Sequence, residues 1–303
     1  MKRRYEVWFL RLGLADHTGA WWFRYLLMNL GKAGCGEQPQ RRPVQVWAAW
    51  FPRGEPSRHW IQGFPADQLK LSPRHHSPFY FAVGDNSIDD RSCRGRLAVG
   101  GDEITWELNY RSRWSITLSN KGWIGFSKTA CSDARFSGAI RLNGRSFNGE
   151  PLAWGVQGHN CGFRHRRFWT WTHAVFHHAD ESLSTFEALV YEMPLGLVFA
   201  KAILFHGGDK IVFRRFSNEM RDCQSLSWLF QATASDGTRI EATIDGSGLC
   251  VHRLPYVKTD CSGTFEVSNN SLADARLVLT RPSGEQLRLQ TVGGAVLEMA
   301  GEP

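Results

Sequence analysis

The sequence predicts an all-β protein built as two antiparallel β-barrel domains. Thirteen tryptophans and nineteen phenylalanines, together with 30 glycines and 12 prolines, favour strands and turns over helices. Short apolar runs recur along the whole chain with turn dipeptides between them, and no amphipathic stretch of ten or more residues predicts a helix. The strands predicted below are too many for one ordinary sheet, so two barrels are expected.

In the first half of the chain, two turn signals fix the hairpins. Gly100-Gly101-Asp102 and Asn143-Gly144 each join two apolar runs, and Asn-Gly is a strong hairpin signal. The region 70–90 carries Pro73, Pro78 and the pair His75-His76, and is predicted to be a long loop. Strands are predicted here at 5–12, 20–28, 44–51, 60–64, 93–99, 104–110, 134–142 and 145–147.

The second half repeats the same rhythm. Asp236-Gly237 and Ser283-Gly284 are turn dipeptides. Strands are predicted at 168–175, 185–192, 198–205, 210–216, 227–234, 239–244, 263–267, 276–280, 286–291 and 295–299. The basic segment Arg164–Arg167 is the best boundary, which gives domains at 1–164 and 165–303.

The formal charge of +7 raises the question of an anionic partner. The basic residues occur in twos and threes and form no long run, recognition helix or zinc-finger spacing. A solvated arginine surface is therefore favoured, and no nucleic acid partner is predicted. Peripheral contact with an anionic membrane stays open as a weaker interpretation, one that predicts binding steeply weakened by salt.

The seven cysteines are an odd number and include no C-x-x-C pair. They predict neither a disulfide framework nor a structural zinc site, and they favour reduced thiols in a cytoplasm. Glu6, Arg11 and Asp16 interrupt the segment after the basic amino terminus, so no signal-peptide core is expected. The apolar stretch 195–205 is too short for a membrane span and contains Lys201.

The most unusual stretch is Trp154–Gly162, in which glycines bracket His159 and Asn160. A strand pattern follows, with Trp169, Trp171 and His173 on one face. Polar groups beside an aromatic wall are what a mostly apolar ligand site requires. The sequence has no glycine-rich phosphate loop, so no nucleotide cofactor is expected.

Four segments in succession resemble one superfamily. They are Phe136–Arg145, Gly158–Gly162, Trp169-Thr170-Trp171 and Thr185-Phe186-Glu187. The superfamily includes carotenoid 1,2-hydratases (hydroxyneurosporene synthases), tocopherol cyclases, related bacterial proteins and some fungal pericyclases. The resemblance covers roughly residues 5–215 and rests on the order of the motifs. Its His-Asn-Trp-Gly segment matches His159 to Gly162, except that Cys161 replaces the tryptophan and changes the shape of the expected pocket.

The resemblance implies two lipocalin-like β-barrels packed together, with a hydrophobic ligand in or between them. It also implies a choice among water addition to an isoprenoid alkene, ring closure, pericyclic chemistry and plain lipid binding. We therefore expect a cofactor-independent enzyme for an isoprenoid or polyketide-like molecule, acting by acid-assisted hydration, cyclisation or isomerisation. The alternative is a non-catalytic carrier of lipid.

Protonating an alkene needs an acid in a dry, cation-stabilising site. The candidate acid/base groups are His159, His173 and Glu187. Asn160 could orient a water molecule or a substrate oxygen. The residues expected to contact the ligand are Asn160, Trp169, Trp171, Trp106, Tyr110, Tyr191 and Arg24. An inward Glu187 would be either protonated or paired with Arg24 or another arginine.

Each candidate has a structural alternative. The His159-Asn160 pair could serve only to end a strand, the two tryptophans could be barrel core, and Glu187 could belong to a hydrogen-bonded structural pair. Cys161 as a nucleophile lacks a third orienting group in the sequence. A metal bound by His159, His165 and His173 matches no familiar ligand spacing, so no metal is predicted.

Overall fold

A computed structural model of the protein describes residues 5–28, 34–72, 79–120 and 125–301. It confirms the predicted all-β class, with two barrel-like units of antiparallel strands. Unit 1 consists of Met1–Trp50, Arg58–His165 and Tyr256–Thr264. Unit 2 consists of Phe51–Ser57, Arg166–Pro255 and Phe265–Pro303. No helix in the described ranges is long and apolar enough to cross a membrane.

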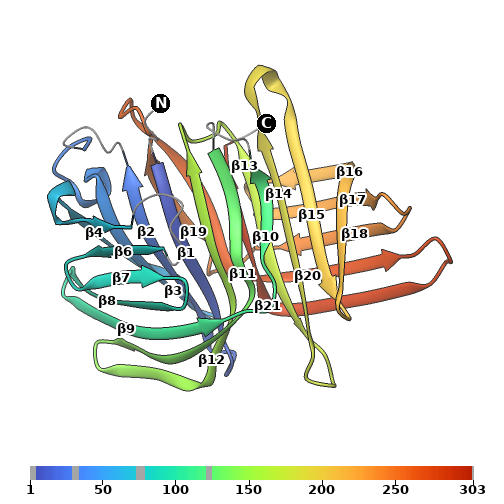
Figure 1. Cartoon of the computed structure of the whole chain (residues 1–303), viewed down its shortest axis with the longest axis horizontal. Coiled ribbons are helices and arrows are strands. Elements are labelled where there is room, and N and C mark those ends of the chain that lie inside the picture. The colour runs from blue at the N-terminus through green and yellow to red at the C-terminus, as the bar shows by residue number, and fades with distance from the viewer. Residues whose placement is uncertain (1–4, 29–33, 73–78, 121–124, 302–303) are drawn as a thin grey trace. The chain divides into compact units, whose positions relative to one another are not determined.

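A twelve-stranded sheet forms unit 1. Its order is β4-β3-β2-β1-β12-β11-β9-β8-β7-β6-β5, and β10 pairs with β11 (Figure 1). Two short 3-10 turns, η1 (Pro39–Arg41) and η2 (Ala66–Gln68), connect its strands. The strands are β1 (Tyr5–Leu14), β2 (Gly19–Met28), β3 (Val44–Pro52), β4 (Arg58–Phe64), β5 (Lys70–Leu71), β6 (Tyr80–Val83), β7 (Asn86–Asp89), β8 (Ser92–Val99), β9 (Asp102–Arg111), β10 (Ile116–Asn120), β11 (Gly125–Leu142) and β12 (Arg145–Gly162).

Side chains show that this sheet curls around a tryptophan-rich core. The indole nitrogen of Trp60 in β4 donates to Asp102 at the start of β9, 2.8 Å away, although five strands separate β4 from β9 in the sheet. Trp21 stacks on Trp50 inside the curl, with ring centroids 4.9 Å apart. Every second residue of β1, from Trp8 to Leu14, faces this core, and the residues between them face the other side of the sheet.

Unit 2 contains a closed barrel. Its sheet runs β18-β17-β16-β15-β14-β13-β21-β20, and a further pairing of β18 with β20 closes these eight strands, while β19 pairs with β20. The short turn η3 (Pro194–Gly196) follows β14. The strands are β13 (Trp169–His177), β14 (Leu183–Glu192), β15 (Val198–His206), β16 (Asp209–Asp222), β17 (Ser227–Ala234), β18 (Arg239–Asp245), β19 (His252–Val257), β20 (Thr264–Thr280) and β21 (Gln286–Ala300).

The strand predictions need corrections, and β10 and β19 were not predicted at all. The region 70–90 is not one long loop, because its described residues include β6 and β7, which pair in register. The His75-His76 pair lies outside the described residues. The predicted strands 263–267 and 276–280 are one strand, β20, and those at 286–291 and 295–299 are one strand, β21.

The expectation of reduced thiols throughout is wrong for one pair of cysteines. Cys35 and Cys261 form a disulfide within unit 1, with their Cα atoms 5.3 Å apart. The bond ties the segment Tyr256–Thr264 to the loop between β2 and β3. The other cysteines are free thiols, and four of those five are buried.

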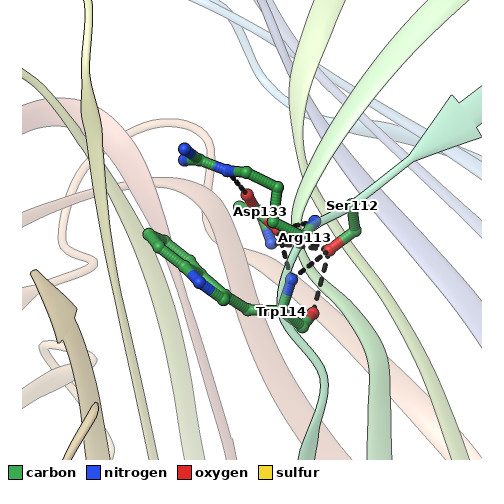
Figure 2. A network of polar contacts seen from close by, with 4 residues as sticks. All are labelled: Ser112, Arg113, Trp114 and Asp133. Carbon is green, nitrogen blue, oxygen red and sulfur yellow. Dashed lines mark hydrogen bonds and ion pairs between the residues drawn. The ribbon is translucent and has the colours of Figure 1, made fainter. Parts of the chain in front are cut away.

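A buried carboxylate organises the turn that joins β9 to β10. Asp133 lies where the pairing of β11 with β12 shifts register, and it is 4% exposed. Its carboxylate accepts hydrogen bonds from the backbone N–H groups of Arg113 at 2.9 Å and Trp114 at 3.1 Å, and from the hydroxyl of Ser112 (Figure 2). Arg113 Nε also donates to it, 2.9 Å away. Asp133 thus satisfies two backbone donors of a turn that lies between strands.

Replacing Asp133 with alanine is expected to lower the free energy of unfolding by about 3 kcal/mol, because two backbone donors lose a charged acceptor. Urea unfolding followed by circular dichroism measures the change. The matched control is Asp180→Ala, which removes an exposed turn carboxylate bound by Ser182 and should cost less than about 1 kcal/mol. Equal costs at both positions would contradict the assigned role of Asp133.

Candidate functional site

His159 lies within a strand and not at its end. It belongs to β12, where it pairs with Trp8 of β1. The glycines on either side make room for rings on the opposite face of the sheet: a Cβ at Gly158 would lie 2.2 Å from the Phe9 ring, and one at Gly162 would lie 2.6 Å from the Tyr5 ring. The close approach of these two rings to the backbone explains why both positions are glycine. The side chain of His159 points to the other face, which it shares with Trp8 and the core.

The nearest ionisable partner of His159 is Glu6. The imidazole Nε2 lies 2.9 Å from Glu6 Oε1, and the side chains are 21% and 10% exposed. Glu6 and Trp8 alternate along β1, so the carboxylate reaches His159 diagonally across the two strands. The contact forms an acid/base pair that holds an exchangeable proton and keeps some access to solvent.

Aromatic rings surround this pair. Trp8 stacks on the imidazole with centroids 4.5 Å apart, and Phe126 meets it edge-on at 4.7 Å. Phe79 lies 6.4 Å from the imidazole and 5.9 Å from Trp8. The indole N–H of Trp8 is buried and has no hydrogen-bond acceptor among the described residues. A buried donor of this kind is uncommon in proteins and suits a ligand oxygen.

Trp106 and Tyr110, both in β9, belong to the same core as Trp8. Trp106 donates to the Tyr25 hydroxyl at 3.0 Å and approaches Cys93 Sγ at 3.2 Å. Tyr110 donates to the Asp89 carbonyl. Burial raises the pKa of Tyr25 and Tyr110 well above 10 and that of Cys93 to about 12, so all three stay neutral. These contacts favour a structural role at this end of the core.

Asn160 and Arg24 lie on the opposite face of the sheet from His159. The guanidinium of Arg24 is surrounded by the rings of Trp22, Trp47 and Tyr256, at 5.3, 4.8 and 4.6 Å from Cζ. It donates a hydrogen bond to the Tyr256 hydroxyl. The expected pairing of Arg24 with Glu187 would join unit 1 to unit 2, and it stays a prediction.

The remaining predicted residues lie in unit 2. His173 and Glu187 are fully buried and directly opposite each other on β13 and β14. The indole N–H of Trp171 donates to Glu187 Oε1, 2.9 Å away. All three face away from the barrel core, which takes the alternate residues of the same strands, such as Ala174 and Phe186.

Two further predicted residues share this face of unit 2. Trp169 donates to Glu298 of β21 at 2.8 Å. Tyr191 stacks on Phe199 with centroids 4.9 Å apart. Lys201 lies on the same face, and burial lowers its pKa, with smaller contributions from Arg214 and Lys210 and an opposing one from Glu187. This face therefore combines acidic, basic and aromatic groups that are buried or half-buried.

The structure places the predicted residues in two groups within unit 1 and one group within unit 2. The first contains His159 and, farther along the same core, Trp106 and Tyr110. The second contains Arg24, with Asn160 on the same face of the unit 1 sheet. The third contains Trp169, Trp171, His173, Glu187 and Tyr191. No group of three or more His, Cys, Asp or Glu side chains in the described ranges has the spacing of a metal site.

Glu6 is a member of the site that was not among the predicted candidates. From the sequence it was taken only as a charge that interrupts an apolar segment. A signal was present, because Glu6 alternates with Trp8, Leu10 and Leu12 on the apolar face of a predicted strand. An inward carboxylate at such a position needs a partner, and His159 supplies it.

Comparison with known proteins supports the fold. No protein-family model and no curated protein match the chain. Solved structures match almost its entire length. These proteins share its fold. A protein assigned as AttH from Nitrosomonas europaea is 14% identical, with a TM-score of 0.55 over 99% of this chain and 93% of that one.

Two further structures are similar over 99% of this chain and 89% of their own. Kievitone hydratase from Nectria haematococca is 10% identical with a TM-score of 0.57. CghA bound to Sch210972 is 9% identical with a TM-score of 0.62. At such low identities the likeness establishes architecture and carries no residue roles. It agrees with the two-barrel fold that the sequence resemblance implied.

Proposed function

We propose that the protein is a cofactor-independent enzyme that hydrates, cyclises or isomerises a hydrophobic small molecule of the isoprenoid or polyketide type. The observation that carries the proposal is the His159–Glu6 pair, 2.9 Å apart and enclosed by aromatic rings. The names of two structures with the same fold are compatible with it: one is a hydratase, and the other holds a small molecule.

The chemistry would begin with transfer of the proton held by the pair to an alkene carbon. The faces of Trp8 and Phe126 would stabilise the cation that forms, since aromatic faces attract positive charge. The buried indole N–H of Trp8 would donate to an oxygen of the substrate and fix its position. Water or an internal hydroxyl then adds to the cation, and the proton released returns to the pair.

Glu187 and His173 form a second candidate acid/base cluster. Both side chains are fully buried, whereas His159 keeps 21% of its side chain exposed. A substrate must reach the group that protonates it, and this favours the His159 cluster. We propose that Trp171 and Glu187 contribute mainly through their hydrogen bond.

Deuterium labelling tests the proposal. Hydrophobic molecules that co-purify with the protein are identified by mass spectrometry, and the extracted fraction is then incubated with fresh protein in D2O. An acid-assisted reaction places deuterium on carbon in a time-dependent way. The variant His159→Phe keeps the ring that stacks on Trp8 but has no proton to donate, and it should show no labelling.

The wild-type protein and the variant could both yield the same molecules without any label. That result would favour the carrier function and overturn the proposal of an enzyme. The carrier predicts that binding survives in His159→Phe, because the apolar contacts of the ring remain. Extraction of bound molecules from the variant checks this point in the same experiment.

A further inference from the structure

The face of the unit 1 sheet opposite His159 carries a buried guanidinium that has no carboxylate partner among the residues the structure describes. Arg24 is 8% exposed, and within the described part of the chain its hydrogen bond goes to the neutral phenol of Tyr256. A guanidinium has five N–H donors, and a desolvated cation is costly unless a counter-charge accepts from them. Three ring faces within 5.3 Å offset part of this cost but provide no acceptor.

A second buried donor lies beside Arg24. Trp22 precedes it by two residues in β2, so both side chains emerge on the same face, and Trp22 is 6% exposed. Its indole N–H has no hydrogen-bond acceptor among the described residues. A buried indole N–H without an acceptor, next to a buried guanidinium whose side-chain hydrogen bond goes to a phenol, is what an absent acceptor would leave behind.

The charge of this face is positive. Arg11 pairs with Trp22 across β1 and β2 and emerges on the same side, and burial lowers its pKa to about 9. His165 stacks on Tyr5 at 4.6 Å and meets Tyr256 edge-on, with 6.4 Å between the ring centroids. Desolvation and then the charge of Arg24 lower the pKa of His165 to about 3, so its imidazole is neutral. The guanidinium groups therefore carry the positive charge at neutral pH.

We infer that Arg24 and Trp22 form a binding site for a hydrophobic molecule bearing a carboxylate. The planar guanidinium can donate two parallel hydrogen bonds to a carboxylate. The rings of Trp22, Trp47 and Tyr256 would contact the apolar part of the ligand. A phosphate or a small hydrophilic anion would leave the aromatic surfaces uncovered. The site is separate from the proposed chemistry at His159, which faces the opposite side of the same sheet.

The test compares cis-parinaric acid, a fluorescent polyene carboxylate, with its uncharged methyl ester at pH 8. Wild-type protein should bind the acid at least about 10-fold more tightly, as expected for charge-assisted hydrogen bonds to a buried guanidinium. Arg24→Gln should reduce this ratio to less than about 3-fold, since the amide keeps polarity but loses the charge.

Two control variants should keep the wild-type ratio. Arg145→Gln removes an exposed guanidinium that lies 4.8 Å above Phe147, a comparable ring contact without burial. His159→Phe removes the proposed acid, so an unchanged ratio separates this site from the enzyme proposal. Arg24→Lys keeps the positive charge but cannot donate two parallel hydrogen bonds, so it should give an intermediate ratio. This variant replaces Arg24→Gln in the test if Arg24→Gln fails to fold.

Equal binding of acid and ester by wild-type protein would overturn the inference, and so would binding of neither probe. Full retention of the ratio in a folded Arg24→Gln variant would also overturn it. In that case Arg24 would have a purely structural role, through its ring contacts and its hydrogen bond to Tyr256.

Discussion

The variant Glu6→Gln is expected to lose deuterium-labelling activity by at least about 100-fold while keeping its fold. The amide still reaches His159, but it cannot accept the proton or stabilise an imidazolium, and general acid–base catalysis of this kind contributes about 100- to 10,000-fold to a rate. The measurement is the initial rate of deuterium incorporation into the co-purified molecules, with thermal melting as the check of folding.

Glu187→Gln is the matched comparison, because it neutralises the other buried carboxylate that was a candidate acid. Its Oε1 accepts from Trp171, and an amide oxygen can still do so, so this variant should keep most of the rate. The opposite pattern, with activity lost in Glu187→Gln and kept in Glu6→Gln, would move the chemistry to unit 2 and contradict the His159 assignment.

Acid is expected to destabilise the protein through His165. Its pKa is lowered from 6.5 to about 3 in the folded state, so between these values the unfolded chain binds a proton that the folded protein does not. Above pH 6.5 the ring is neutral in both states and has no effect. Below it, the free energy of unfolding should fall by about 1.4 kcal/mol per pH unit, reaching a loss of about 4 to 5 kcal/mol near pH 3.

Urea unfolding at pH 7, 5.5 and 4.5 checks this expectation in wild-type protein and in His165→Phe, which keeps a ring stacked on Tyr5. Burial also lowers the pKa of His59 and His206, which gives both proteins a background of the same sign. The difference between the two slopes therefore isolates His165. Identical slopes for wild type and His165→Phe would be inconsistent with the lowered pKa.

Local signals were sufficient for most of the fold. Asn143-Gly144 is the turn between β11 and β12, with Leu142 paired to Arg145. The sequence failed where polar residues are buried inside a strand. Ser268 to Ser271 have the composition of a loop, yet all four lie in β20, because a register shift lets the pairing with β21 continue past Asn270.

The candidate sites were less predictable, since their parts are far apart in the chain. His159 was recognisable within its motif, but Glu6 lies 153 residues away and Tyr256 lies 232 residues from Arg24. The disulfide joins residues 226 positions apart, a distance at which cysteine spacing carries no information. Such contacts depend on the order of strands in the sheet, which periodicity does not determine.

Unit 1 is made of three separate stretches of the chain, and this constrains how the protein can fold during synthesis. Its third stretch, Tyr256–Thr264, is made long after its second stretch ends at His165. At about 5 to 20 residues per second, the ribosome needs roughly 5 to 20 s more to supply that stretch. Unit 1 must therefore wait, without its Tyr256 and its disulfide, until most of unit 2 has been translated. The nascent chain exposes Arg24 and its tryptophans during that interval, which makes it a natural client for a chaperone.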